Sequence, residues 1–562
     1  MIDRAAERRR RLNRRALPAL GGLGLLALGA GIAVGSLAPS SDEQAARSFA
    51  RAWERRDYSA MYALLAGRSR SRYDRAAFER AYEKARRTAT VTGIRAQPTA
   101  GEQDGAVRVP VDVRTRLFGT LRGELLVPVV DGDVDWAPHL VFPELPEGVP
   151  LTRRTEPPKR AKLLARDGKV LAEGEAGERS SPLGPVGYSI AGQLAPERTV
   201  RGRREVYARG FARTMPIGQT GLERVFEREL AGRPGAELLA GKRVLARSRP
   251  RPGRPIRTTI DVGLQRAAVA ALAGRLGGVA ALDARTGEIR ALAGIAMSGA
   301  QPPGSTFKIV TTTAALEAGA VELSTEFPVR TEALIDGVPL ENANGESCGG
   351  TFRISFAHSC NSVFAPLGVK LGARRLVDAA ERYGFNERPT LPGLAPSTLP
   401  PASDIRTPLE VGATAIGQGR VLATALELAS MAQAVGRRGV RVEPTLRAGA
   451  RRTRRRVTSP RIAATLRRLM VDVVAYGTGT AAGLPGVRVA GKTGTAELED
   501  TRGPNAVTQR PASDPTKTDA WFTSFAPAAR PKIAVSVMLV RAGAGGQTAA
   551  PAARLVLQSA LG

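Results

Sequence analysis

The chain has 562 residues, with 83 Lys and Arg against 52 Asp and Glu, and its formal net charge is +31. This length predicts three or four domains of about 150 residues each, and the 43% of hydrophobic and 24% of charged residues exclude wholesale disorder. Two Cys exclude a disulfide-stapled scaffold or a multi-zinc protein, and two His leave little material for a His-rich metal centre or a Ser-His-Asp triad.

The basic residues are almost all arginine, since only ten of the 83 are Lys. This bias is explained either by the codon usage of the genome or by attraction to an anionic partner. A nucleic-acid surface would show basic stripes with interleaved aromatic residues. Aromatic residues make up only 4% of the chain and the arginines are spread along it, so we expect no nucleic-acid partner. We interpret the densest internal run, Arg451–Arg456, as a solvated loop.

The first forty residues predict a membrane anchor. Residues 1–15 contain seven Arg, and residues 16–38 contain no charge. A helix of these 23 residues is about 35 Å long, enough to cross a hydrocarbon core of about 30 Å. The basic tail 1–15 places the N-terminus in the cytoplasm and residues 41–562 outside it. A cleaved signal peptide is the alternative, because Ser36–Ala38 resembles a small-x-small cleavage site.

Residues 41–143 predict a small α+β domain. Ser41–Gln44 fits a helix capping box, and alternation from Val107 to Val113 predicts a strand. Two aromatic pairs at four-residue spacing indicate buried helix faces, namely Phe49 with Trp53 and Phe78 with Tyr82. Residues 144–256 contain a hairpin signal at Asp167–Gly168 and no titratable cluster, so we interpret them as a separate scaffold or linker domain.

Residues 257–562 form the largest predicted unit. We expect helices over 262–276 and 550–561, and strands over 278–283, 288–292, 520–525 and 532–540. Hairpins that feed helices at both ends of this range indicate one antiparallel sheet covered by helices.

The first candidate motif is Ser305-Thr-Phe-Lys308, which follows two prolines and a glycine and precedes an apolar helical run. A spacing of three residues places Ser305 and Lys308 on one helix face, as a serine nucleophile and its lysine base require. The base must be neutral, so the pKa of Lys308 must fall several units from about 10.4 through burial or a nearby cation. An N-capping serine followed by a surface lysine is the alternative.

Two further motifs follow, and each is weak alone. Ser359-Cys360-Asn361 offers a hydroxyl that can relay a proton and an amide that can hold a peptide group, although a helix cap has the same composition. Lys492-Thr493-Gly494-Thr495 continues an alternating, edge-like strand. Its Lys and Thr side chains suit a carboxylate, and its glycine lets a ligand approach the backbone.

Lys492 also completes the P-loop pattern Gly486–Thr493. A true P-loop follows a strand and opens a helix. Here the residues before the lysine read as a strand, no helical pattern follows it, and the site would lie outside the cell. We therefore interpret the P-loop pattern as a chance match and not as a nucleotide-binding site.

In this order and spacing, the three motifs match the S-x-x-K, S-D-N and K-T-G set. The sequence resembles a class B penicillin-binding protein, and residues 41–143 resemble the nuclear-transport-factor-two-like extension of some members. The sequence departs from the pattern at Cys360, where class A enzymes have Asp, and the segment between Gly287 and Ser305 is short. The resemblance implies a multidomain α+β fold: basic tail 1–15, transmembrane helix 16–38, cone-like α+β domain 41–143, β-rich dimerisation or pedestal domain 144–256, and transpeptidase domain 257–562 with an antiparallel sheet covered by helices.

The resemblance also implies roles for the site residues. Ser305 would attack the penultimate D-Ala of a D-Ala-D-Ala stem peptide, and Lys308 would take its proton. Ser359 would relay a proton to the leaving amine, and Asn361 would hold the substrate amide. Lys492 would supply positive potential, and Thr493, Gly494 and Thr495 would bind the substrate, with both threonines at its terminal carboxylate. Backbone N–H groups of Ser305 and Thr495 would form the oxyanion hole, and no metal or cofactor is needed.

The implied protein is a peptidoglycan D,D-transpeptidase, anchored in the inner membrane, that β-lactams acylate and a glycan polymerase accompanies. A β-lactamase or β-lactam sensor of the same fold is one alternative, but Asn361 differs from the class D pattern and no E-x-x-L-N segment supplies the class A glutamate. A catalytically inactive cell-wall scaffold is another. Cys348 and Cys360 either pair, because the expected compartment is oxidising and the loop is short, or are two buried small side chains.

Overall fold

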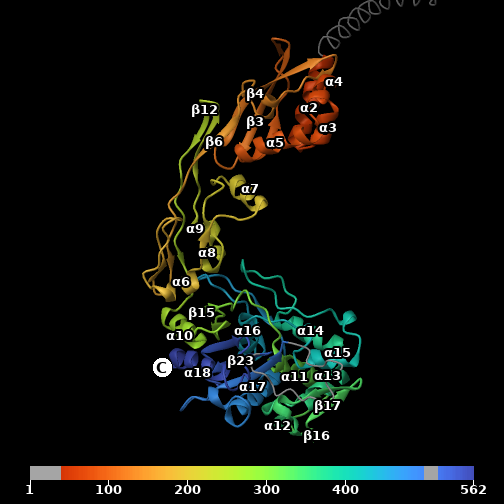
Figure 1. Cartoon of the computed structure of the whole chain (residues 1–562), viewed down its shortest axis with the longest axis vertical. Coiled ribbons are helices and arrows are strands. Elements are labelled where there is room, and N and C mark those ends of the chain that lie inside the picture. The colour runs from red at the N-terminus through yellow and green to blue at the C-terminus, as the bar shows by residue number, and fades with distance from the viewer. Residues whose placement is uncertain (1–39, 499–516) are drawn as a thin grey trace, which may run out of the picture. The chain divides into compact units, whose positions relative to one another are not determined.

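The computed structural model describes residues 40–498 and 517–562, so the predicted tail 1–15 and anchor 16–38 lie outside the described residues (Figure 1). Within those two ranges, no helix is long and apolar enough to cross a membrane. The described chain divides into two compact units. The first contains residues 40–158, 197–215 and 233–251, and the second contains 159–196, 216–232, 252–498 and 517–562. The chain therefore passes from one unit to the other five times.

The first unit begins with four helices beside an antiparallel sheet. The helices are α2 (Ser41–Arg55), α3 (Tyr58–Ala63), α4 (Gly67–Arg72) and α5 (Arg75–Thr88). The strands are β1 (Val91–Ala96), β2 (Glu102–Gln103), β3 (Ala106–Thr115), β4 (Gly119–Val130) and β5 (Asp133–Val134), in the order β1-β3-β4-β5 with β2 paired to β3. The predicted alternation is confirmed, because the four valines from Val107 to Val113 are buried and share one core with the four helix aromatics.

The first helix begins one residue earlier than its predicted capping box. The N-cap is Ser40, whose hydroxyl accepts a hydrogen bond from the Glu43 N–H, rather than Ser41. With this cap, Asp42 and Glu43 both lie in the first turn. Their negative charges are favourable there, because the first turn carries the positive end of the helix dipole.

A second sheet completes the first unit. It has the order β12-β11-β6, with β6 (Leu151–Glu156), β11 (Gly235–Ala240) and β12 (Arg243–Ser248), and α7 (Val200–Ala208) packs against α5. The sequence predicts one separate domain over 144–256, but the structure divides these residues between the two units. The physical reason is that β6 pairs over its full length with β11, a strand far along the chain.

The other part of this range belongs to the second unit. Its elements are β7 (Leu163–Leu164), β8 (Val170–Ala172), α6 (Pro185–Ala191), β9 (Leu194–Ala195), β10 (Ile217–Gly218), α8 (Gly221–Val225) and α9 (Glu227–Leu230). The predicted hairpin at Asp167–Gly168 joins β7 to β8. A buried ion network holds the segments together: Arg160 contacts Glu223 at 2.6 Å and Glu227 at 2.7 Å, and Arg179 contacts Glu223 at 2.7 Å.

The centre of the second unit is a five-stranded antiparallel sheet in the order β15-β14-β24-β23-β22. Its strands are β14 (Gly277–Asp283), β15 (Ile289–Gly294), β22 (Ala490–Glu497), β23 (Thr518–Ala526) and β24 (Ile533–Leu539), which confirms the four strands predicted from the sequence. Helices α10 (Val262–Leu272) and α18 (Ala549–Leu561) cover one face, and α16 (Ala425–Gly436) covers the other. The first helix ends four residues before the prediction, because Ala273 and Gly274 take positive φ.

The remaining elements surround the α16 face or line the rim of the second unit (Figure 1). They are β13 (Ile256–Arg257), α11 (Lys308–Glu317), β16 (Glu326–Arg330), β17 (Glu332–Ile335), β18 (Val338–Glu341), β19 (Cys348–Thr351), α12 (Phe352–Ala357), α13 (Asn361–Leu371), α14 (Ala373–Tyr383), α15 (Pro408–Ala415), β20 (Val440–Val442), β21 (Arg454–Arg456) and α17 (Pro460–Ala475). The run interpreted as a solvated loop is exposed at Arg454–Arg456, but these residues form a strand paired with β20.

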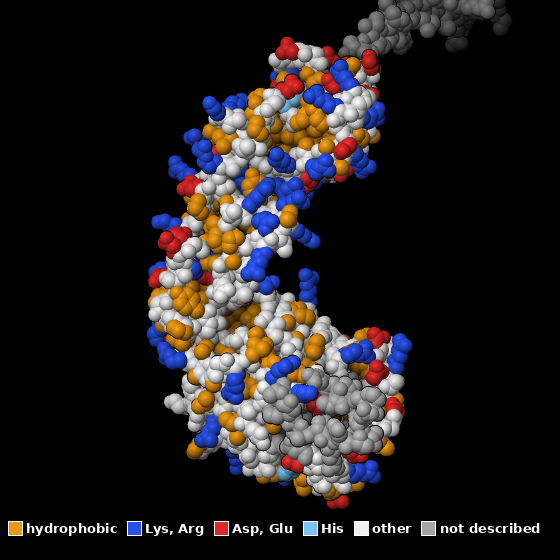
Figure 2. Space-filling view, viewed as in Figure 1, with side chains coloured by type: hydrophobic (Ala, Val, Ile, Leu, Met, Phe, Trp, Pro, Cys, Tyr) orange, Lys and Arg blue, Asp and Glu red, His pale blue; other side chains and the backbone are white. Residues whose placement is uncertain are grey.

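Charged side chains do not gather in one stripe. Figure 2 shows Lys and Arg distributed over the visible face of each unit, with Asp and Glu between them. Many of these charges are paired across short distances, as in the bidentate contact of Arg108 with Glu124.

Candidate active site

The first motif lies at the start of a buried helix. Gly304–Phe307 form the 3-10 turn η2, and α11 continues directly from Lys308. Ser305 is half-buried on this turn, whereas Lys308 is completely buried. A Cβ added to Gly304, whose φ is +52°, would lie 2.5 Å from the Thr495 carbonyl oxygen. The absence of a side chain at Gly304 therefore allows the turn that carries Ser305 to approach strand β22.

The second motif contains a strained residue. Ser359 lies between α12 and α13 with a φ of 62°, in the left-handed region that costs a residue with a side chain about 1–2 kcal/mol. The backbone is fixed on both sides of the strain, because the Ser359 N–H donates to the Phe356 carbonyl and the Cys360 N–H donates to the Ser355 carbonyl. Strain of this kind is concentrated at functional sites. Here it brings both the carbonyl and the hydroxyl of Ser359 within reach of Lys308.

The Nζ of Lys308 makes the central contacts of the site. It donates to Asn361 Oδ1 at 2.6 Å and to the Ser359 carbonyl oxygen at 2.7 Å, and it lies 3.3 Å from Ser359 Oγ. Burial, and then the neighbouring Lys492, hold the pKa of Lys308 well below its ordinary value. A neutral amine has two N–H donors, and the two shortest contacts use both. Its lone pair is then not used by these contacts, which is the state that the predicted base role of Lys308 requires.

The third motif lies on β22, the outermost strand of the five-stranded sheet. Lys492 is completely buried, and its Nζ donates to Ser359 Oγ at 2.8 Å and to the Thr493 carbonyl oxygen at 3.1 Å. Burial lowers the pKa of Lys492 to about 7. The Ser359 hydroxyl therefore lies between two amines. Two neighbouring buried amines are not both charged at low cost. We assign the proton first to Lys492, because its charge is one of the causes that lower the pKa of Lys308.

The position of Lys492 excludes the P-loop interpretation. Both Lys492 and Thr493 lie inside β22, and their strand pairs with β23 from Ala490 to Glu497. A P-loop requires a glycine-rich turn before the lysine and a helix that begins at it. The pattern Gly486–Thr493 is therefore a coincidence of sequence.

The side chains that follow Lys492 are already in contact with protein. Thr493 Oγ lies 2.6 Å from Thr478 Oγ, and Thr495 Oγ accepts a hydrogen bond from the Gly545 N–H at 3.2 Å. A Cβ on Gly494 would lie 2.6 Å from the Pro303 carbonyl oxygen. The sequence predicts that Gly494 admits a ligand; in the structure it admits the turn before Ser305, which aligns the first and third motifs.

The side chain of Asn361 is fixed at both ends. Its Oδ1 accepts from Lys308, and its Nδ2 donates to the Glu341 carbonyl oxygen at 2.7 Å. The next residue, Ser362, donates through its N–H to the buried Asn342 side chain at 2.9 Å. The sequence alone does not indicate these two contacts. Glu341 takes part through its backbone carbonyl, and Asn342 lies in an ordinary polar turn.

A disulfide joins Cys348 to Cys360, with the Cα atoms 5.4 Å apart. It connects the middle residue of the second motif to β19, and the Ser362 hydroxyl donates to the Cys348 carbonyl oxygen at 3.1 Å beside it. Of the two alternatives that the sequence leaves open, the structure contains the paired one. Within residues 40–498 and 517–562, no group of three or more His, Cys, Asp or Glu is placed to hold a metal ion.

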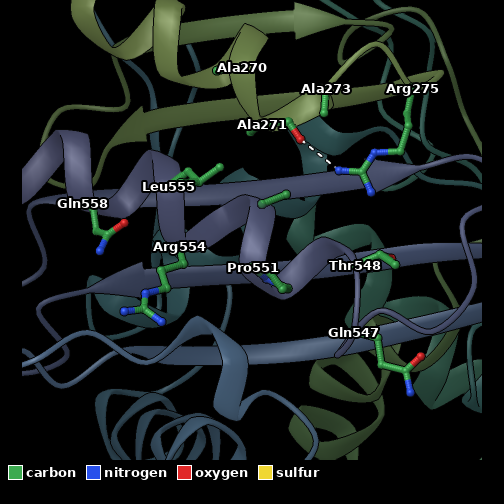
Figure 3. A pocket seen from close by; sticks show the side chains of 11 residues that line it. Ala270, Ala271, Ala273, Arg275, Gln547, Thr548, Pro551, Arg554, Leu555 and Gln558 are labelled. Carbon is green, nitrogen blue, oxygen red and sulfur yellow. Dashed lines mark hydrogen bonds between the residues drawn. The ribbon is translucent and has the colours of Figure 1, made fainter.

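The motif residues do not line a cavity of about 490 Å³ in the second unit. That cavity lies between α10 and α18 (Figure 3). Its polar lining consists of Arg275, Arg554, Gln547, Gln558 and Thr548, and Arg275 is held by the carbonyl of Ala271 at 3.3 Å. Because this lining has no carboxylate, His, Lys or Cys, it offers no acid or base. The candidate site therefore remains at the three motifs on η2, β22 and the segment between α12 and α13.

Two parts of the chain match families of known proteins. Residues 277–558, half of the chain, match the family model described as the penicillin binding protein transpeptidase domain, and residues 41–149 match the NTF2-like N-terminal transpeptidase domain. The peptidoglycan D,D-transpeptidase PbpA of Mycobacterium tuberculosis is 37% identical over 295 residues, which cover 47% of this chain and 56% of that protein. The peptidoglycan D,D-transpeptidase MrdA of Acinetobacter baumannii is 28% identical over 400 residues, which cover 60% of each. The chain thus spans little more than half the length of these relatives.

Solved structures extend the similarity. The crystal structure of PBPA from Mycobacterium tuberculosis has a TM-score of 0.57 and 27% identity, and the match covers 72% of this chain and 100% of that one. The penicillin G acyl-enzyme complex of the same protein has a TM-score of 0.58 and 28% identity, with the same coverage. The aligned relative is thus described with a β-lactam bound covalently.

Proposed function

Because the chain belongs to the penicillin-binding protein transpeptidase family, we propose that it is a D,D-transpeptidase that cross-links peptidoglycan stem peptides through an acyl-enzyme on Ser305. One observation carries this proposal: the amine of Lys308 is completely buried one turn after Ser305, and its two short hydrogen bonds go to the second motif. An ordinary capping serine followed by a surface lysine has neither feature.

The first half of the reaction forms the acyl-enzyme. The Ser305 hydroxyl oxygen attacks the carbonyl carbon of the penultimate D-Ala, and the neutral amine of Lys308 accepts its proton. The negative charge on the carbonyl oxygen is stabilised by the backbone N–H groups of Ser305 and Thr495, and one such donor is typically worth about 3 kcal/mol. When the bond to the terminal D-Ala breaks, its nitrogen takes the proton held by Lys308 through the Ser359 hydroxyl, and Lys308 is neutral again.

Recognition of the terminal carboxylate is assigned to the third motif. Lys492 carries the positive charge, and the hydroxyls of Thr493 and Thr495 donate to the carboxylate oxygens. Support comes from burial: Lys492 has no access to water, so its charge acts in a medium of low dielectric constant, where it is worth more than at a surface.

The second half of the reaction regenerates the enzyme. The amine of a second stem peptide attacks the Ser305 ester, and neutral Lys308 accepts a proton from that amine as the new amide bond forms. This proton then passes to the Ser305 oxygen when the ester bond breaks, which restores the free hydroxyl. Water would perform the same step in a β-lactamase. The sequence lacks the E-x-x-L-N segment that supplies the class A deacylating glutamate, which favours transfer to an amine over hydrolysis.

We also propose a single-pass anchor over residues 16–38, with the N-terminus in the cytoplasm, both described units outside, and a glycan polymerase as partner. The uncharged run after a basic tail supports the orientation. A reporter enzyme that is active only outside the cytoplasm, fused after Gly562, tests it: the fusion should be active, and deletion of 16–38 should abolish that activity. An inactive fusion would contradict the orientation.

The proposed activity is tested by labelling the full-length chain in detergent with a fluorescent penicillin, beside Ser305→Ala. We expect a covalent band that the substitution abolishes and that persists for many minutes. A band that disappears within seconds would indicate a β-lactamase, and an absent band at high drug concentration would contradict the proposed chemistry. Transfer is then measured with a D-Ala-D-Ala donor peptide and an amine acceptor, by mass spectrometry of the cross-linked product.

A further inference from the structure

Thr478 contacts both the second and the third motif. It lies in the segment Tyr476–Gly479, which connects α17 to the 3-10 turn η5 (Thr480–Ala482). Its N–H donates to the carbonyl oxygen of Ala357 at 3.1 Å, two residues before Ser359. Its hydroxyl lies 2.6 Å from Thr493 Oγ on β22. One residue therefore connects the two motifs, through its backbone on one side and its side chain on the other.

Two glycines allow the segment to lie this close. A Cβ on Gly477 would lie 2.2 Å from the Ala357 carbonyl oxygen, and a Cβ on Gly479 would lie 3.0 Å from the ring of Phe522. The chain is thus packed between α12 and β23 without side chains on either side of Thr478. The hydroxyl that reaches Thr493 is held by this backbone and not by a flexible loop.

The directions of the two hydroxyl protons follow from the distances. Each threonine has one proton to donate, and the other acceptor for Thr478 is the Ala357 carbonyl at 3.5 Å, the outer limit of a hydrogen bond. If Thr478 donates to Thr493, the Thr493 proton is left for an incoming anion. Bonds to an anion are the stronger ones, and chained hydroxyls polarise one another. A bound carboxylate therefore favours this direction.

We infer that Thr478 is a positioning residue, which donates to Thr493 and thereby directs the Thr493 proton to the substrate carboxylate. The inference rests on the proposed function, because it assigns the ligand of Thr493. It predicts that loss of the Thr478 hydroxyl impairs only ligands that carry the carboxylate. If Thr478 only held the two motifs together, loss of its hydroxyl would instead slow acylation by every ligand.

The test compares benzylpenicillin with its methyl ester, which lacks the charged carboxylate. Second-order acylation constants are measured on the full-length chain by intact-protein mass spectrometry. For Thr478→Val, which keeps the shape and the backbone N–H, we expect acylation by benzylpenicillin to fall about tenfold, as for loss of a hydrogen bond that serves a charged group, while the ester is unaffected. Thr478→Ser should retain the wild-type ratio. Thr480→Val, two residues on at an exposed position, should leave both constants unchanged.

Equal losses for the two probes, or no loss for either, would overturn the inference while leaving the proposed function intact. Failure of the wild type to react with either probe would overturn the proposed function and, with it, the inference. A double substitution adds a second criterion: in a Thr493→Val background, Thr478→Val should have no further effect, and independent losses would refute the coupling. If valine is not accommodated, Thr478→Ser and Thr478→Ala differ only by the hydroxyl oxygen and give the same comparison.

Discussion

Replacing Lys492 by methionine should stabilise the second unit while removing its carboxylate recognition. Burial lowers the pKa of Lys492 from 10.5 to about 7, and each pKa unit corresponds to about 1.4 kcal/mol. The buried ammonium therefore costs the folded state about 5 kcal/mol at low pH. Its hydrogen bonds to Ser359 and Thr493 recover about 1 kcal/mol each. Methionine fills a similar volume without a charge, so we expect a net gain of about 3 kcal/mol at pH 6.

The gain should depend on pH in a defined direction. The pKa of Lys492 is lower in the folded than in the unfolded state, so between about pH 7 and 10.5 the unfolded chain binds more protons and stability rises with pH. The cost is complete below about pH 7 and is lost as the pH approaches 10.5. At pH 9 the cost has fallen by about 3 kcal/mol, and the advantage of methionine should have nearly vanished.

The measurement is pulse proteolysis of the full-length chain in urea at pH 6 and pH 9, with cleavage inside β23 and β24 quantified by mass spectrometry as the readout of the second unit. Lys532→Met, at an exposed position, is the matched control and should change little. A methionine variant that is less stable than the wild type at pH 6, or equally favoured at both pH values, would refute the reasoning that the buried ammonium is a stability cost.

Three further outcomes follow from the site. The rate constant of acylation by penicillin should rise as the pH passes the depressed pKa of Lys308, because only the neutral amine of Lys308 takes a proton. The rate constant should then fall above about pH 7, because Lys492 loses its charge. A rate constant that still increases to pH 9 would contradict the expected role of the Lys492 charge. Gly494→Ala should slow acylation about 100-fold, because its Cβ would displace the Pro303 carbonyl by an ångström-scale shift, whereas Gly67→Ala, with open space around it, should be silent in the same labelling assay. Cys348→Ser should lower the urea stability of the second unit by about 3 kcal/mol through loss of a short covalent loop, and reductant should destabilise the wild type by the same amount but leave the variant unchanged.

The local parts of the site could be predicted from the sequence because each depends on a short spacing. The spacing of three residues from Ser305 to Lys308 predicts one helix face, and the alternation before Lys492 indicates an edge strand. The structure places these residues in η2, α11 and β22. The strands of the large sheet could be predicted from the sequence equally well, because their apolar runs are continuous and bounded by turn residues.

The remaining parts depend on contacts between distant residues or on backbone atoms. Residue types alone do not predict the left-handed φ of Ser359 or the hydrogen bond from Asn361 to the Glu341 carbonyl. The segment Gly477-Thr478-Gly479 did carry a signal, since two glycines around a hydroxyl indicate a close backbone approach. Its partner Thr493 could not be inferred without the fold. Likewise, no local pattern in the sequence predicts that β6 pairs with β11.

The five crossings of the chain between the two units have a consequence for synthesis. Four of them occur at a proline, namely Pro158, Pro196, Pro216 and Pro252. The sheet β12-β11-β6 is complete only when residue 248 has been made, and by then residues 159–196 and 216–232 have been synthesised without the strands β14 and β24 of their own unit. One cut therefore cannot remove either unit, and a chain that ends between β6 and β11 has β6 without its partner strand, which is an aggregation hazard.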